Sequence, residues 1–159
     1  MYARGICALA EEARALGEVW IVAPDGERSA ASHSITLTRP LRIEERGARI
    51  FAISGTPADC VYIALHRILP RTPDLLLSGV NHGPNLGDDV TYSGTVAGAM
   101  EGALNGIPSL AVSSTSKADD AVVHGAHLAM AVAREILERG APRRVFYNLN
   151  VPLGAQVIR

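Results

Sequence analysis

Residues 78–113 read SGVNHGPNLGDDVTYSGTVAGAMEGALNGIPSLAVS, and this stretch decides the fold. It begins as a polar, glycine-rich loop directly after the apolar run 75–77. It continues into a helix that begins at Ser93 and ends in a second apolar run at 109–112. A strand that leads through such a loop to the free amides of a helix start is a common way to bind phosphate. The stretch therefore predicts an α/β fold with an anion site at this helix start.

The helix expected after Ser93 combines an apolar face with a ridge of glycines. Gly94, Gly98 and Gly102 lie four residues apart, and interior glycines cost roughly 1 kcal/mol each against alanine. The ridge therefore predicts close backbone packing, which would offset that cost. At the helix start the amides of Gly94 and Thr95 have no partner within the helix, and Ser93 can cap the first turn. The apolar face consists of Val96, Ala99, Met100, Ala103 and Leu104.

Two interpretations of this helix start remain open from its own residues. It is either an ordinary buried helix capped by a serine or the start of a ligand site. The preceding loop favours the second interpretation, because it holds more polar side chains than a plain connector of this length needs. These side chains are Asn81, His82, Asn85, Asp88 and Asp89.

The composition fits one globular domain. Of the 159 residues, 48% are hydrophobic and 19% are charged. With 15 basic and 16 acidic residues and only 4% aromatic residues, we expect neither bulk nucleic-acid binding nor stacking platforms for single strands. No apolar run approaches the length of a membrane span. Cys7 and Cys60 lie in helical patterns and are expected to be buried free thiols in a reducing cytoplasm.

The order of the remaining segments predicts a doubly wound α/β fold, Rossmann-like, with a mostly parallel sheet. Two short apolar runs around a polar turn predict a β-hairpin excursion from that sheet. The expected helices are 6–16, 56–69, the helix from 93, and 119–139. The expected strands are 19–23, 73–77, 109–112 and 144–148, with the hairpin at 41–43 and 50–53.

Polar side chains that follow the expected strands are the site candidates. Ser29 follows the strand at 19–23, and Asn81 follows the strand at 73–77. Loops at the carboxyl ends of parallel strands line one rim, so these two residues and the Ser93 helix start should converge. From the residues alone, a solvated loop serine is the favoured interpretation of Ser29, whereas Asn81 is equally a turn residue.

Other polar groups give weaker signals. Asp88 and Asp89 could bind Mg²⁺, but a solvated loop is favoured because adjacent side chains rarely point to one spot. His124 and His127 share a helical face opposite the apolar one, which favours a solvated surface over a metal site. His33 and His82 lie in rim loops and could assist catalysis, but a loop histidine without function is the favoured interpretation of each. The sequence holds neither a G-x-S-x-G elbow nor a Walker lysine motif.

Three blocks of the chain, VAPDGERSAASHSIT (22–36), SGTPADCV (54–61) and the stretch 78–113, closely resemble the SurE family of stationary-phase survival proteins. The resemblance covers essentially the whole chain, as one SurE-like domain over residues 1–159. It implies a Rossmann-like fold and a cytoplasmic, metal-dependent 5′/3′-nucleotidase that uses Mg²⁺ or Mn²⁺ and acts on nucleoside monophosphates. It also implies a homodimer or homotetramer.

The same resemblance assigns roles to particular residues. Ser29 and Asn81 match the family's serine and asparagine metal ligands. Asn85 and the helix start Ser93-Gly94-Thr95 match the groups that hold the phosphate. Neutral oxygen ligands suit Mg²⁺ or Mn²⁺ but alone would bind such an ion weakly.

One departure from the family pattern concerns the start of the chain. The family begins with a strand that ends in Asn-Asp-Asp-Gly and is followed by a segment like residues 2–6. That strand and its two aspartates are absent here, as is the family's C-terminal part, so we expect a domain truncated at both ends with impaired activity. The catalytic residues stay unknown, and a non-catalytic nucleotide- or phosphate-binding module is the alternative function.

Overall fold

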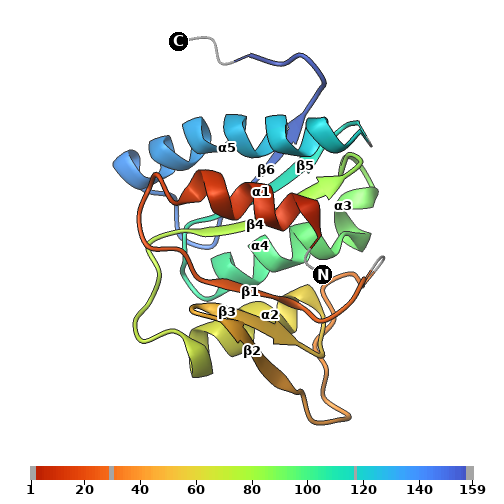
Figure 1. Cartoon of the computed structure of the whole chain (residues 1–159), viewed down its shortest axis with the longest axis vertical. Helices are drawn as coiled ribbons and strands as arrows, with labels where there is room; N and C mark the ends of the chain where they lie inside the picture. Colours follow the sequence, from red (N-terminus) through yellow and green to blue (C-terminus); the bar gives the residue numbers. More distant parts are fainter. Residues whose placement is uncertain (1–2, 29–30, 117, 157–159) are drawn as a thin grey trace.

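The computed structural model describes residues 3–28, 31–116 and 118–156 (Figure 1). It shows the expected Rossmann-like α/β fold, in which helices and mainly parallel strands alternate along the chain. The elements are α1 (Arg4–Ala13), β1 (Ile21–Pro24), β2 (Ile43–Gly47), β3 (Ile50–Ile53), α2 (Pro57–Ile63), a π-helical turn η1 (Ala64–Ile68), β4 (Leu76–His82), α3 (Asp89–Tyr92), α4 (Gly94–Leu104), β5 (Ser109–Ser114), α5 (Asp119–Arg139) and β6 (Phe146–Val151).

The strands form two separate sheets of three strands each, in the orders β1-β3-β2 and β4-β5-β6. All neighbours in the second sheet are parallel. In the first sheet β3 pairs parallel with β1, while β2 pairs antiparallel with β3. The expected hairpin is therefore present, but only β2 is an excursion, because β3 belongs to the sheet beside β1.

Helices cover both faces of the second sheet, as a doubly wound fold requires (Figure 1). Helices α1 and α5 pack together on one face, and α4 packs on the other, where it also contacts α2. The main core lies between β4, β5, α1 and α5. Its fully or nearly fully buried members are Leu9, Ala13, Val80, Leu110, Val112, Val122, Ala126, Ala129, Met130 and Ile136.

Most strands differ in extent from the sequence expectation by a few residues, and the shifts of β4 and β6 matter for the site. The strand expected at 73–77 is β4, which runs on to His82, so Asn81 lies in the strand rather than in the loop after it. Polar side chains do not end this strand, because its backbone still pairs with β5: Asn81 lies opposite Ser113, and His82 opposite Ser114. The last strand, β6, is likewise shifted towards the C-terminus relative to 144–148.

The glycine ridge of α4 makes the close packing that its spacing predicts. An added Cβ at Gly98 would lie 2.8 Å from Ser78 Oγ, and one at Gly102 would overlap Ser109 Oγ. The predicted apolar face was wrong at Leu104, which is 53% exposed. The helix is instead buried on most of its circumference, and even Glu101 has only 8% of its surface exposed.

The two cysteines differ from each other. Cys60 is buried, and desolvation is the main cause that raises the pKa of its thiol to about 12. The prediction of a buried Cys7 was wrong, because this residue lies on the exposed side of α1. In the part of the chain that the structure describes, no helix combines the length and apolar character needed to cross a membrane.

We predict that Gly5→Ala destabilises the fold. Gly5 is buried where α1 crosses β4, and an added Cβ would overlap the backbone carbonyl oxygen of Val80, which cannot rotate away. Overpacking of this kind costs roughly 1–3 kcal/mol of unfolding free energy. Urea denaturation followed by circular dichroism measures the loss. Gly26→Ala is the control, because an added Cβ there meets nothing within 4 Å. Equal stability of the two variants would contradict the packing argument.

Candidate functional site

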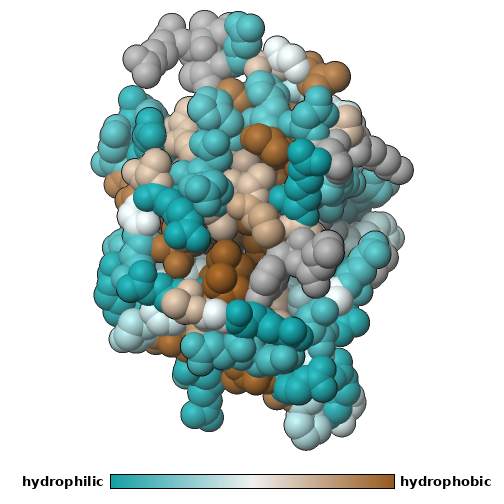
Figure 2. Space-filling model, in the orientation of Figure 1, coloured by the Kyte–Doolittle hydropathy of each residue, from teal (hydrophilic) through white to brown (hydrophobic). Residues whose placement is uncertain are grey.

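A cleft of about 1490 Å³ separates the two sheets. It is lined by β1 on one side and by β4 on the other, with α1 and the start of α4 contributing further residues. Both strands lie at the edge of their sheets, so each offers an edge without a partner strand among the described residues. Figure 2 shows apolar surface in the middle of this face, between hydrophilic surfaces above and below. The cleft is therefore an opening between two parallel strand edges with an apolar lining.

The structure brings most of the predicted site residues to this cleft. Asn81, Asn85, Ser93, Gly94 and Thr95 all line it. They come from β4, from the loop after it and from the start of α4, as expected for the carboxyl ends of parallel strands. Ser29 lies outside the described residues.

The start of α4 has the geometry of an anion site. Ser93 Oγ accepts a hydrogen bond from the amide of Val96 at 3.2 Å, which caps the first turn as predicted. The amides of Gly94 and Thr95 precede the first i to i−4 hydrogen bond, so the helix itself gives them no acceptor. Their partial positive charge faces a cleft large enough for a small ligand.

The position of Gly94 also fixes the loop beside it. An added Cβ at Gly94 would lie 2.9 Å from Pro57 Cγ and 3.6 Å from the carbonyl oxygen of Arg28. The loop after β1 and the start of α2 therefore lie directly against the start of α4. A side chain at this position would press on Pro57 at the start of α2, whereas it would only touch the loop at Arg28.

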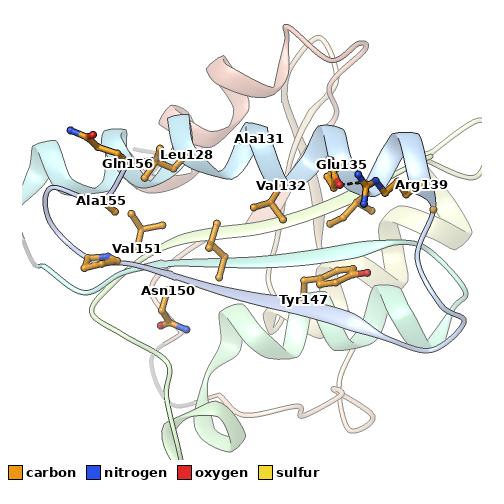
Figure 3. Close-up of a pocket in the computed structure, with 14 residues that line it drawn as sticks. Leu128, Ala131, Val132, Glu135, Arg139, Tyr147, Asn150, Val151, Ala155 and Gln156 are labelled. Carbon is orange, nitrogen blue, oxygen red and sulfur yellow. Dashed lines mark ion pairs between the residues drawn. The ribbon is translucent and has the colours of Figure 1, made fainter. Parts of the chain in front are cut away.

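Asn85 is held by a network of hydrogen bonds that the sequence did not reveal. Its side-chain amide donates to Ser113 Oγ at 2.7 Å, and its backbone amide donates to Asn150 Oδ1 at 2.8 Å. Its carbonyl oxygen accepts from Asn148 Nδ2 at 2.9 Å and from Asn150 Nδ2 at 3.2 Å. Asn150 points away from α5 in Figure 3, towards this network. The signal available in the sequence was the alternation Asn-Leu-Asn in the last strand, which places both asparagines on one face.

The described residues do not build a divalent metal site by themselves. Asn81 is half-buried, and its Nδ2 donates to the carbonyl oxygen of Gly83 at 2.9 Å. Its oxygen is a neutral donor, and the described residues include no group of three His, Cys, Asp or Glu side chains suited to a metal. Asp88 and Asp89 are exposed in and beside the short helix α3. A divalent ion needs more negative charge than this set provides.

The four histidine candidates divide between the cleft and other contacts. His82 lines the cleft at the end of β4. His33 Nε2 lies 2.8 Å from Glu101 Oε2, and His33 is not among the cleft-lining residues, which argues against its use as a base there. On α5, His124 bonds to the carbonyl oxygen of Ala155, and the exposed His127 lies 3.3 Å from Glu12.

A second hollow of about 580 Å³ lies between α5 and β6 (Figure 3). Its lining is largely apolar, with Val132 and Leu149 among the side chains, and an ion pair of 2.7 Å between Glu135 and Arg139 at one end. None of the predicted site residues that the structure describes lines it. The cleft between the sheets is therefore the candidate site.

Asp59 is a buried carboxylate that joins α2 to the loop after β1. Its Oδ2 accepts from Thr36 Oγ1 at 2.6 Å and from the Thr56 amide at 2.9 Å, while Oδ1 accepts from the Thr36 amide at 2.9 Å. Burial opposes its ionisation, but the hydrogen bonds from Thr36 and Thr56 outweigh burial and lower the pKa of Asp59 below its usual 3.8. The expected capping box of α2 is thus present and also holds the loop.

Comparison with known proteins identifies the family. The family model described as Survival protein SurE matches residues 1–159. The chain belongs to the SurE family. It is 53% identical over 151 residues to the 5′-nucleotidase SurE of Pelobacter propionicus, covering 94% of this chain and 61% of that protein. It is 52% identical to the 5′-nucleotidase SurE of Geobacter sulfurreducens, with 96% of this chain and 58% of the relative covered.

The fold comparison agrees with the family. The crystal structure of the SurE protein from Aquifex aeolicus superposes with a TM-score of 0.90 at 42% identity, over 95% of this chain and 62% of that one. This SurE chain therefore spans about three fifths of the length of the relatives that it matches.

We predict that Asp59 makes the stability of the chain depend on pH in the acid range. Because its folded-state pKa lies below 3.8, the ionised carboxylate stabilises the fold above that pH, and the contribution is lost as the pH falls through the folded-state value. Asp59→Asn should lower the unfolding free energy by about 1–3 kcal/mol at pH 7 and by less near pH 3.

Urea denaturation between pH 7 and pH 3 provides the measurement. The control is Asp74→Asn, because Asp74 forms an exposed ion pair with Arg71, and such a pair should contribute under about 1 kcal/mol. Parallel stability profiles of Asp59→Asn and the unmodified chain over this range would show that the carboxylate is not stabilised as described.

Proposed function

We propose that this chain forms the larger part of a phosphatase that removes phosphate from nucleoside 5′- and 3′-monophosphates. The observation that carries the proposal is the start of α4, where Ser93, Gly94 and Thr95 line the cleft together with Asn81 and Asn85. The relatives named 5′-nucleotidase SurE support the same activity and substrate class.

The helix start suits a phosphate group because its unpaired amides donate hydrogen bonds and its dipole favours negative charge. Ser93 and Thr95 add hydroxyl groups beside these amides. Rigid donors of this kind stabilise the charge that develops on the phosphoryl oxygens without having to reorganise during the reaction. Asn85 is held by β5 and β6 through Ser113 and Asn150, so the loop in front of the helix is fixed as well.

The proposed activity needs groups beyond the described residues. Since Asn81 offers one neutral oxygen, we propose that the remaining ligands of a divalent ion, Mg²⁺ or Mn²⁺, come from Ser29 and from a further strand that carries the Asn-Asp-Asp-Gly sequence. The cleft supports this idea, because a strand parallel to β1 and β4 would pair with both edges and join the two sheets into one. We accordingly propose that a SurE domain without this strand has impaired activity.

A non-catalytic nucleotide- or phosphate-binding module is the second candidate. The observation that favours it is the lack of an acidic metal-binding group among the described residues. Such a module would bind phosphate at the start of α4 without turning it over. A cytoplasmic location and a dimeric or tetrameric assembly complete the proposal and follow from the family resemblance alone.

We predict metal-dependent phosphate release only when the further strand is present. The test compares the chain with the same chain preceded by a strand ending in Asn-Asp-Asp-Gly, using AMP and GMP with Mg²⁺, Mn²⁺ or EDTA. Release by the extended chain alone supports the nucleotidase. A folded extended chain that binds AMP but releases no phosphate with any metal would favour the binding module.

We further predict that Asn81→Ala in the extended chain lowers phosphate release at least about tenfold, since loss of a supporting group around a metal already costs that much. Asn81→Asp keeps an oxygen at the same place and should retain more activity than the alanine variant. Titration of Mn²⁺ during turnover distinguishes weaker metal binding from a slower reaction. Unchanged rates and metal dependence in Asn81→Ala would remove Asn81 from the site.

A further inference from the structure

The loop after β1 cannot hold its own position by hydrophobic burial. Residues 25–36 read DGERSAASHSIT, and the largest apolar side chain among them, Ile35, is 40% exposed. Yet this loop lies beside the cleft, with the Arg28 carbonyl oxygen close to Gly94. Its placement therefore depends on polar contacts with neighbouring elements.

One short segment, residues 54–59, supports both halves of this loop. The guanidinium Nε of Arg28 donates to the carbonyl oxygen of Gly55 at 3.2 Å, and Thr56 Oγ1 donates to the carbonyl oxygen of Ser34 at 2.7 Å. The two hydrogen bonds from Thr36 to Asp59 complete the support. The segment 54–61 therefore supports the loop after β1 in addition to capping α2, and the capping-box pattern alone predicts only the second role.

A second support comes from the other side, through α3 and α4. His33 contacts Glu101, whose other carboxylate oxygen accepts from Asn105 Nδ2 at 2.9 Å. Ser32 donates through its amide to the Tyr92 carbonyl oxygen at 3.1 Å, directly before the start of α4. The second half of the loop is therefore held between α2 and α4.

The two carboxylates in these supports are among the most buried polar side chains of the chain. Asp59 is 2% exposed and Glu101 is 8% exposed. Neither lines the cleft, so neither reaches a ligand bound there. Burying a carboxylate costs free energy unless it is hydrogen-bonded, and in both cases the hydrogen bonds include the loop.

We propose that Asp59 and Glu101 are positioning residues, which hold residues 31–36 of the loop against α2 and α4. By fixing this end of the loop they restrain its other end, residues 25–28, which line the cleft. The proposal rests on the proposed function for its chemical meaning. A displacement of about 1 Å in a positioning element can cost on the order of 100-fold in rate. Loss of the hydrogen bonds that Asp59 and Glu101 make to the loop can therefore lower the rate, although neither carboxylate contacts a ligand in the cleft.

The experiment uses Asp59→Asn and Glu101→Gln, which keep the side-chain size and remove the charge. Glu12→Gln is the matched control, because Glu12 also contacts a histidine, His127, but on the exposed side of α1. Limited trypsin digestion of the chain reports local opening of the loop through cleavage after Arg28. Cleavage after Arg134, in the middle of α5, reports global unfolding in the same sample.

We expect the ratio of cleavage after Arg28 to cleavage after Arg134 to rise at least about fivefold in both charge-removing variants, as a local loss of about 1 kcal/mol implies. Glu12→Gln should leave the ratio unchanged. In the extended chain, kcat for AMP per folded molecule should fall about tenfold or more with KM within about threefold, because a displaced loop affects the transition state more than binding.

An unchanged cleavage ratio in both variants, an equal rise in the control, or an opened loop with unaltered kcat would overturn the proposal. If the unmodified extended chain releases no phosphate, the proposed function fails, and the cleavage ratio still decides whether the two carboxylates hold the loop. A purely structural contribution is recognised separately, because it lowers the folded fraction and leaves kcat per folded molecule as it was.

Discussion

The close approach of α4 to the elements beneath it is the constraint on which the rest of the structure depends. The absence of side chains at Gly94, Gly98 and Gly102 lets the helix backbone lie against Pro57, Ser78 and Ser109. These contacts reach three different elements, α2, β4 and β5, so the helix can take only one position and direction. Its first turn consequently opens onto the cleft at the carboxyl end of β4.

Polar side chains do much of the positioning in a chain whose buried residues are mostly small. The Asn85 network joins the loop before α3 to β5 and β6, and Asp59 and Glu101 join the loop after β1 to α2 and α4. Each of these buried groups has hydrogen-bond partners that lie far away in sequence. Directional contacts of this kind specify where a loop lies, which contact between alanine side chains does not.

The division of the strands into two sheets leaves the cleft between them. Within the described part of the chain, β1 and β4 each have one paired and one unpaired edge, and the unpaired edges face the same space under α1. Unpaired strand edges favour association with another strand. A further strand in this opening would join the two sheets and, in the proposed function, would bring negative charge beside Asn81.

Much of this protein was determined by local sequence. The helix starts at Thr56 and Ser93, the glycine ridge and the helix 119–139 follow from capping chemistry and spacing, which depend on neighbours a few residues away. The polar loop residues that gather at the cleft were also predictable, because the carboxyl ends of parallel strands share one edge.

Tertiary structure alone decided the rest. The continuation of β4 to His82, the burial of Glu101 and the support of Asn85 by Asn148 and Asn150 all depend on partners more than twenty residues away in sequence or on the opposite side of a helix. A hydrophobic pattern records whether a side chain is apolar, and it does not record which distant donor or acceptor will face a polar one. For that reason the sequence predicted that the candidate residues Asn81, Asn85 and 93–95 gather at one edge, and the fold determined what holds them there.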